Sequence, residues 1–120
     1  MIAVIFEVVP HPDRRGAYLD LAAMLRPQLE AMDGFISVER FESLTTPGKM
    51  LSLSYWRDEA AIERWRNIEA HRRVQEKGRA HIFADYRLRV AAVLRDYGLV
   101  DRAEAPGDSR QAHGDRSEPR

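Results

Sequence analysis

The feature that most constrains this chain is the order in which strand-like and helix-like hydrophobic patterns follow one another. Residues 2–9 are rich in β-branched and aromatic types and predict a buried strand. From Tyr18 to Met32, apolar residues recur at helical spacing, which predicts a helix with one apolar stripe. Residues 34–43 and 49–57 then alternate along the chain and predict the two strands of an antiparallel hairpin.

Alternation also assigns a face to each side chain of this hairpin, because successive residues of a strand point to opposite sides of the sheet. In the first strand Ile36, Val38 and Arg40 point one way, and Phe35, Ser37, Glu39 and Phe41 point the other. In the second strand Leu51, Leu53 and Tyr55 lie opposite Met50, Ser52, Ser54 and Trp56. The hairpin is therefore predicted to separate its side chains into two distinct faces.

Residues that favour turns and helix ends stand at the expected boundaries. Pro27 lies within the first helix and predicts a kink or a tighter last turn. Gly34 suits a left-handed exit from that helix. Pro47 and Gly48 stand in the order that a type II turn requires. Asp58 is placed to cap a second helix at its N-terminus.

The second half of the domain repeats the alternation of helix and strand. Asn67 can end the helix that Asp58 begins and cap a third segment that weakens at Gly78. A last strand is expected from about residue 84 to 95, with Tyr86 and Arg87 on opposite faces. The order is β-α-β-β-α-β, which predicts a ferredoxin-like α+β fold with a four-stranded antiparallel sheet and helices on one face.

The other face of such a sheet would still carry apolar side chains. A second copy packed face to face would cover them, so we expect a homodimer that closes a dimeric α+β barrel. We expect this domain to span residues 1–97. Residues 101–120 hold no large apolar side chain, so residues 98–120 are predicted to form a disordered tail.

Composition excludes several classes of protein. The formal net charge is zero, which gives no reason to expect nucleic acid or an anionic membrane as a partner. There is no cysteine, so thiolate catalysis and thiolate metal sites are excluded, and the four histidines lack metal-binding spacing. No stretch is apolar enough to predict a membrane span or a signal peptide, and we expect a cytoplasmic protein.

Several stretches together resemble a known family. They are Gly34-Phe35, the run Ser52-Leu-Ser-Tyr-Trp-Arg-Asp-Glu-Ala, Trp65 followed by His71, and Tyr86-Arg-Leu-Arg-Val. Over residues 1–97 the chain resembles the antibiotic biosynthesis monooxygenase (ABM) domain proteins of the dimeric α+β barrel superfamily. The resemblance identifies the superfamily better than the reaction, because this barrel hosts many activities.

The resemblance implies a cavity between sheet and helices in each subunit. In the quinone-forming members, oxygen is added to an electron-rich aromatic molecule without metal, flavin or haem. Trp65 matches their tryptophan, His71 occupies the position of their neighbouring polar residue, and Arg87 or Arg89 would supply their arginine. The resemblance thus implies a small aromatic substrate, no cofactor, and Trp65 and His71 as catalytic residues.

The spacing of Trp65 and His71 sets a condition on that site. On one unbroken helix two residues six positions apart point about 240° apart, so they can share a cavity only if the helix breaks near Asn67. His71 would then act as a general base or hydrogen-bond the substrate. The alternatives are a histidine bonded to a backbone carbonyl and a tryptophan that belongs to the core.

Three further residues are candidates for the substrate pocket. Ser54 would line the cavity, or simply leave packing space on the sheet. Tyr86 would point into the cavity or toward a dimer partner. Glu7 interrupts an apolar strand and would be either an inward carboxylate with a raised pKa or a surface residue at the edge.

The leading hypothesis is a cofactor-independent monooxygenase acting on a small aromatic or quinone-like molecule. The alternative is a non-enzymatic or stress-related protein that binds a small ligand in the same cavity. Haem degradation is a third possibility. Phe6 and Glu7 stand where the haem-degrading branch has an asparagine. The spacing from Trp65 to His71 is also shorter than in that branch. Both departures count against haem degradation.

Overall fold

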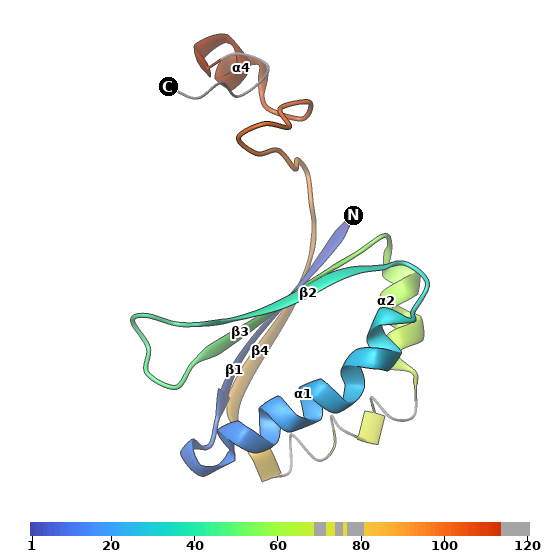
Figure 1. Cartoon of the computed structure of the whole chain (residues 1–120), viewed down its shortest axis with the longest axis vertical. Coiled ribbons are helices and arrows are strands. Elements are labelled where there is room, and N and C mark those ends of the chain that lie inside the picture. Colours follow the sequence, from blue (N-terminus) through green and yellow to red (C-terminus); the bar gives the residue numbers. More distant parts are fainter. Residues whose placement is uncertain (69–71, 74–75, 77–80, 114–120) are drawn as a thin grey trace.

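The computed structural model describes residues 1–68, 72, 73, 76 and 81–113. The strands are β1 (Ile2–Pro10), β2 (Phe35–Glu42), β3 (Met50–Trp56) and β4 (Phe83–Ala92), and the helices are η1 (Pro12–Arg14), α1 (Arg15–Glu30), α2 (Glu59–Arg66) and α4 (Gly107–His113). The strands form one antiparallel sheet in the order β2-β3-β1-β4, and α1 and α2 lie on the same side of it (Figure 1). The predicted ferredoxin-like α+β fold is confirmed, and within one chain the sheet does not close into a barrel.

Strand pairing determines which side chains face the helices. Val4 of β1 pairs with Ser54 of β3 and with Val90 of β4, so these three share a face. Val4 packs against the core that α1 and α2 cover, whereas the neighbouring Ile5 and its partner Leu53 point to the opposite side. The predicted faces of β3 and β4 are confirmed. We call the side that carries Ile5 and Leu53 the open face of the sheet.

The predicted orientation of Phe35 is wrong. The register between β2 and β3 shifts between Phe35 and Ser37, so Phe35 pairs with Trp56 while Val38 pairs with Ser54. Phe35 therefore joins Val38 on the helix side, and its ring meets the Trp56 ring edge-on at 5.4 Å between centroids. An extra residue in one strand reverses the alternation locally, and simple alternation of residue types does not reveal it.

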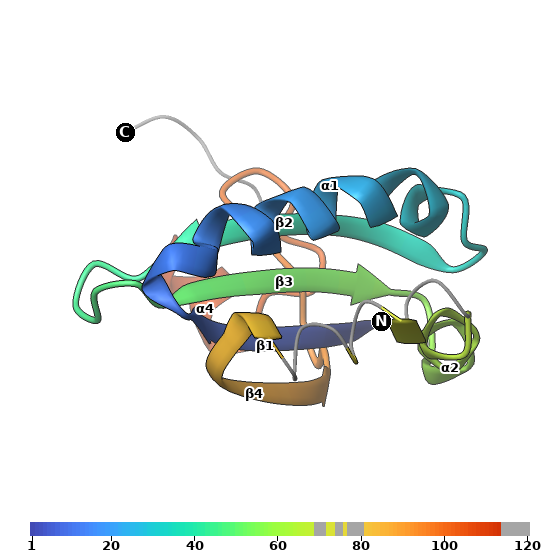
Figure 2. The same ribbon diagram turned by 90° about the horizontal axis from the view of Figure 1, so that it is seen from below.

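The helices bury two separate groups of side chains against the sheet. One group lies toward α2 and consists of Leu25, Leu29, Trp56, Ala61 and Trp65. The other lies toward the start of α1 and consists of Val8, Tyr18, Met50 and Ile82. Figure 2 shows α1 running along the sheet, and its residues contribute to both groups. Pro27 lies inside α1 near its end, where its carbonyl still accepts the backbone N–H of Ala31 at 3.3 Å.

Two glycines have the left-handed backbone that the sequence predicts. Gly48 has a φ of 78°, and the Lys49 N–H donates to the Thr46 carbonyl at 3.2 Å, as a type II turn requires. Gly34 has a φ of 88°. A Cβ added to Gly34 would lie 2.6 Å from the Cβ of Ala61, so only glycine allows α2 to approach this closely.

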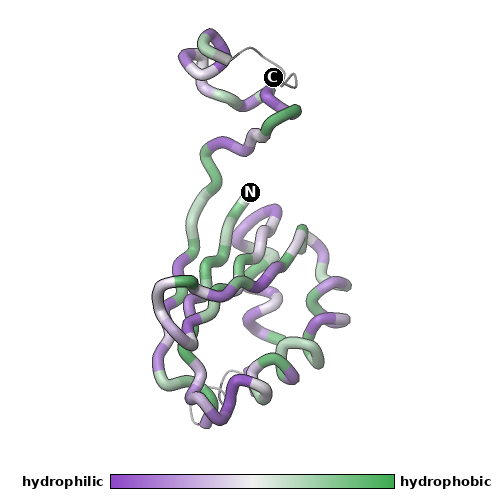
Figure 3. The backbone as a smooth tube through the Cα atoms, turned by 60° about the vertical axis from the view of Figure 1, so that its left-hand side comes forward, coloured by the Kyte–Doolittle hydropathy of each residue, from purple (hydrophilic) through white to green (hydrophobic). Residues whose placement is uncertain are grey.

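The chain beyond β4 runs away from the sheet (Figure 1). The Val93 N–H still donates to the Met1 carbonyl at 3.0 Å, but Leu94 and Leu99 are 80% and 78% exposed. Figure 3 shows this segment leaving the strands, with apolar stretches along it. The helix α4 lies where the sequence predicts no regular structure. The domain limit at residue 97 stays a prediction, as does the disorder of the tail, whose residues 114–120 lie outside the described part.

We expect the substitution Gly34→Ala to destabilise the fold more than Gly48→Ala. Both substitutions place a side chain on a left-handed backbone, at a cost of about 1–3 kcal/mol each. Only the new methyl group at Gly34 would also collide with Ala61, whereas that at Gly48 meets open space. Urea unfolding followed by circular dichroism measures both free energies, and equal losses of stability would contradict the close approach.

Candidate functional site

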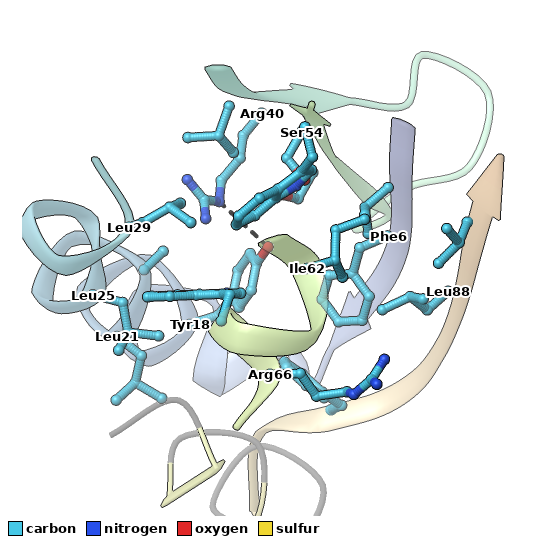
Figure 4. A pocket seen from close by; sticks show the side chains of 18 residues that line it. Phe6, Tyr18, Leu21, Leu25, Leu29, Arg40, Ser54, Ile62, Arg66 and Leu88 are labelled. Atoms are coloured by element: carbon cyan, nitrogen blue, oxygen red, sulfur yellow. Dashed lines mark hydrogen bonds between the residues drawn. The ribbon is translucent and has the colours of Figure 1, made fainter. Parts of the chain in front are cut away.

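A cavity of about 240 Å³ lies between the helix side of the sheet and the helices α1 and α2 (Figure 4). Both groups of buried side chains contribute to its wall, for example Tyr18 and Trp65. Much of the wall is apolar and includes Val4, Phe6, Leu25, Ile62, Leu88 and Val90. A concave, mostly apolar space with a few polar groups is the usual form of a small-molecule site.

Trp65 reaches this cavity because α2 begins and ends where the sequence predicts. The Asp58 carboxylate caps the helix by accepting the Ala61 backbone N–H at 2.9 Å. The helix ends at Arg66, and the side-chain amide of Asn67 turns back to donate to the Glu63 carbonyl at 2.8 Å. Trp65 is buried and lines the cavity.

The predicted break of the helix near Asn67 is thus confirmed, which meets the condition that the sequence set for a site shared with Trp65. His71 itself lies outside the described residues. Its role as a base therefore stays a prediction.

An ion pair also stabilises the position of α2 close to the sheet. Arg57 donates from both terminal nitrogens to the two carboxylate oxygens of Asp33, at 3.1 and 3.0 Å. These hydrogen bonds, with the positive charge of Arg57, hold the pKa of Asp33 below its ordinary value. The Arg57 backbone N–H donates to the Gly34 carbonyl at 2.8 Å. The turn before β2 and the turn before α2 are therefore tied together at one place.

Ser54 lines the cavity, as proposed from the sequence, and so does Ser52. The Ser54 hydroxyl accepts the indole N–H of Trp56 at 2.9 Å. This bond satisfies the only donor of a buried indole and fixes its orientation in the wall.

Glu7 and Arg87 are not among the described residues that line the cavity. Both lie on the open face, where they pair across β1 and β4. The Glu7 carboxylate lies 3.2 Å from the Lys49 amine and 3.4 Å from the Arg89 guanidinium. The hydrogen bond from Lys49 and the two positive charges lower the pKa of Glu7, which corrects the suggestion of an inward base with a raised pKa.

Tyr86 occupies the helix side of β4, yet it too is absent from the cavity wall among the described residues. Its ring packs at 5.7 Å from Phe6 and 5.9 Å from Phe83, measured between centroids. These contacts place Tyr86 in an aromatic group beside the cavity rather than in its lining.

Arg40 is a polar side chain of the cavity that was not singled out from the sequence. Arg40 projects from β2, is half-buried, and donates from Nε to the Tyr18 hydroxyl at 3.4 Å. Its guanidinium carbon lies 5.9 Å from the centroid of the Tyr18 ring. The available signal was the alternation, which placed Arg40 beside Val38 on one face. An arginine on the covered face of a strand is uncommon and points to a polar contact there.

The described residues contain no group of three or more histidine, aspartate or glutamate side chains that could hold a metal ion. Within the same part of the chain, no helix is long and apolar enough to cross a membrane.

The chain is similar to known proteins in both sequence and structure. The sequence profile described as "Antibiotic biosynthesis monooxygenase" matches residues 1–77. The chain is 50% identical over 93 residues to "Jasmonate monooxygenase ABM" of Pyricularia oryzae, across 78% of this chain and 43% of that protein. It therefore spans less than half the length of that relative. It is 33% identical over 93 residues to the uncharacterized protein YqjZ of Bacillus subtilis, across 78% and 79% of the two chains.

Solved structures share the fold at low sequence identity. Rv0793 from Mycobacterium tuberculosis superposes with a TM-score of 0.72 at 23% identity, over 81% of this chain and 98% of that one. PA3566 from Pseudomonas aeruginosa superposes with a TM-score of 0.67 at 19% identity, over 78% and 93%. These likenesses support the ferredoxin-like arrangement of the elements.

We expect Asp58→Ala to lower the thermal stability of the protein, because it removes the cap of the helix that carries Trp65. Asp58→Asn keeps a side-chain oxygen for the Ala61 N–H and should retain most of the stability. The hydrogen bond from Ala61, followed by that from Arg57, lowers the pKa of Asp58 from its ordinary value of 3.8.

This contribution is therefore complete above pH 3.8 and is lost as the pH falls through the lower pKa of the folded state. The difference in melting temperature between the wild type and Asp58→Ala should accordingly shrink in acid. Melting curves followed by circular dichroism at neutral and acidic pH measure this difference. A variant as stable as the wild type at neutral pH would show that the cap is unimportant.

Proposed function

Because the chain belongs to the antibiotic biosynthesis monooxygenase family, we propose that it is a monooxygenase that oxidises a small aromatic or quinone-like molecule in the cavity. The observation that carries this proposal is the largely apolar cavity with Trp65 in its wall. Trp65 is also the residue that the sequence resemblance matches to the family's tryptophan. A flat aromatic ring would stack against such a wall. The relative from Pyricularia oryzae, named as a jasmonate monooxygenase, supports oxygenation of a small organic molecule.

The proposed reaction uses no cofactor. A base removes a proton from an activated carbon of the substrate, and the resulting carbanion passes an electron to molecular oxygen. The substrate radical and superoxide then combine through a new C–O bond to give a peroxide. Its O–O bond breaks with loss of the second proton of that carbon, so that one oxygen atom is retained as a carbonyl and the other leaves as water. An apolar wall favours this chemistry, because it excludes water that would quench the carbanion. We assign the role of base to His71, because histidine is the residue type most often used as a general base near neutral pH.

We expect the protein to oxidise anthrone to anthraquinone, consuming one O₂ and releasing one H₂O per turnover. Anthrone is a suitable test compound because its methylene carbon readily forms a carbanion. An oxygen electrode measures the uptake, and mass spectrometry with ¹⁸O₂ detects one labelled atom in the quinone. Anthrone binding without oxygen uptake would contradict the proposal and support the ligand-binding alternative. A shift of the Soret band on adding haem would favour the haem alternative.

Two variants test the assigned residues in the same assay. Trp65→Phe should lower kcat/KM about tenfold, which corresponds to an aromatic contact worth about 1.4 kcal/mol. His71→Ala should abolish turnover while the protein stays folded. The control is Tyr97→Phe, which removes a hydroxyl from the exposed segment beyond β4 and should leave turnover unchanged. Full activity of His71→Ala would show that the base lies elsewhere.

We further propose that the protein acts as a homodimer that packs through the open face. Among the residues on this face, Ile5, Val9, Leu51, Leu53 and Tyr55 are apolar and only partly buried within one chain. Phe41 on the neighbouring strand β2 is 43% exposed. A contiguous apolar surface of this kind is characteristic of a protein interface. Glu7 would enter that interface already paired with Lys49 and Arg89.

Light scattering at micromolar concentration should therefore give the mass of a dimer. Leu53→Arg should give a monomer, because it would bury an unpaired charge in the interface. The matched control is Leu44→Arg in the hairpin turn, where the side chain is already 101% exposed. A monomeric mass for the wild-type protein would overturn the dimer.

A further inference from the structure

We propose that the cavity contains a subsite for an organic anion, and that the molecule it takes is an aromatic carboxylic acid. Arg40 would bind the carboxylate, and the apolar wall would hold the ring. This inference rests on the proposed function, because it specifies the class of substrate that the same cavity would accept.

The first support is the surroundings of Arg40. Arg40 lines the cavity and is half-buried, and among the described residues its side chain makes a hydrogen bond and a ring contact, both with Tyr18. Within the described part of the chain no carboxylate forms an ion pair with Arg40. Glu42 lies two residues further along the same face of β2, but its carboxylate is paired with Arg15. A partly desolvated cation without an acidic partner favours binding of an anion.

The second support is that the groups around Arg40 are also hydrogen-bond donors. The Tyr18 hydroxyl accepts from Arg40 Nε, which leaves its own O–H free to donate. Ser52 pairs with Arg40 across β2 and β3, so its hydroxyl lies on the same face, and it also lines the cavity. A guanidinium with two hydroxyls beside it matches the several lone pairs of a carboxylate.

The third support is the position of this polar group relative to the apolar wall. Figure 4 shows Arg40 and the Tyr18 hydroxyl turned toward each other, and Phe6, Ile62 and Leu88 lie on another side of the same space. A ligand with one charged end and a flat apolar body would satisfy both regions at once. The cavity is therefore suited to an amphipathic acid better than to an uncharged aromatic molecule.

The test compares 2-naphthoate with 2-naphthamide, which have the same ring system and differ in charge at pH 7. Isothermal titration calorimetry measures the affinity of the whole chain for each. We expect the wild type to bind 2-naphthoate about tenfold more tightly, as a charge-assisted contact at a half-exposed arginine should allow. Equal affinity, or binding of neither compound, would overturn the subsite.

Variants locate the contact. Arg40→Gln should remove the preference for the acid and keep the affinity for the amide, which shows that the cavity is intact. Arg40→Lys should keep part of the preference. The matched control is Arg66→Gln, another cavity arginine but an exposed one, and it should preserve the preference. A preference that survives Arg40→Gln, or disappears in Arg66→Gln, would contradict the assignment to Arg40.

A second variant guards against misfolding of Arg40→Gln. Ser52→Ala removes one donor with little change in volume and should lower the preference for the acid about threefold. An unchanged preference would contradict the arrangement of donors proposed here. Anthrone oxidation by the wild type together with equal binding of the two naphthalene compounds would overturn the anion subsite alone. The proposed monooxygenase function would then stand.

Discussion

The close approach of Gly34 to Ala61 determines where α2 lies, and the cavity depends on that position. Ala61 is fully buried, and any side chain larger than hydrogen at residue 34 would push it away. Trp65 follows Ala61 by four residues, so both point from the same face of the helix. The contact that fixes the position of Ala61 therefore also orients the indole of Trp65 toward the sheet. The bidentate pair of Arg57 and Asp33 holds the same corner from the outside.

Much of the fold could be predicted because local signals agreed with the tertiary arrangement. Alternation identified the faces of β3 and β4, and Asp58 and Gly34 marked element boundaries through backbone requirements that any fold must meet. The predicted face of Phe35 was wrong because a bulge depends on how two strands align. The sequence of one strand alone does not show this alignment. The helix α4 was missed because seven polar and small residues offer no apolar stripe to detect.

The resemblance to the family singled out Trp65, and this residue lies in the cavity wall. Glu7 was singled out because it interrupts an apolar strand. It lies on the open face, because the alternation of side chains along β1 places it opposite Val4 and Phe6. Arg40 was assigned to the correct face. Its importance depends on Tyr18, which approaches from a different element and cannot be inferred from spacing along β2.

The strand order has a consequence for how the protein is made. The strand β1 lies inside the sheet, between β3 and β4, although it is synthesised first. β1 can pair with β3 once β3 has been synthesised. Its other edge pairs with β4, where Ile2 lies opposite Ala92, so this edge stays unpaired until the end of β4 has been synthesised. Until then the nascent chain presents an apolar strand with unpaired backbone groups to solvent or to a chaperone. One edge of β1 therefore stays open to unwanted strand pairing until β4 has been synthesised.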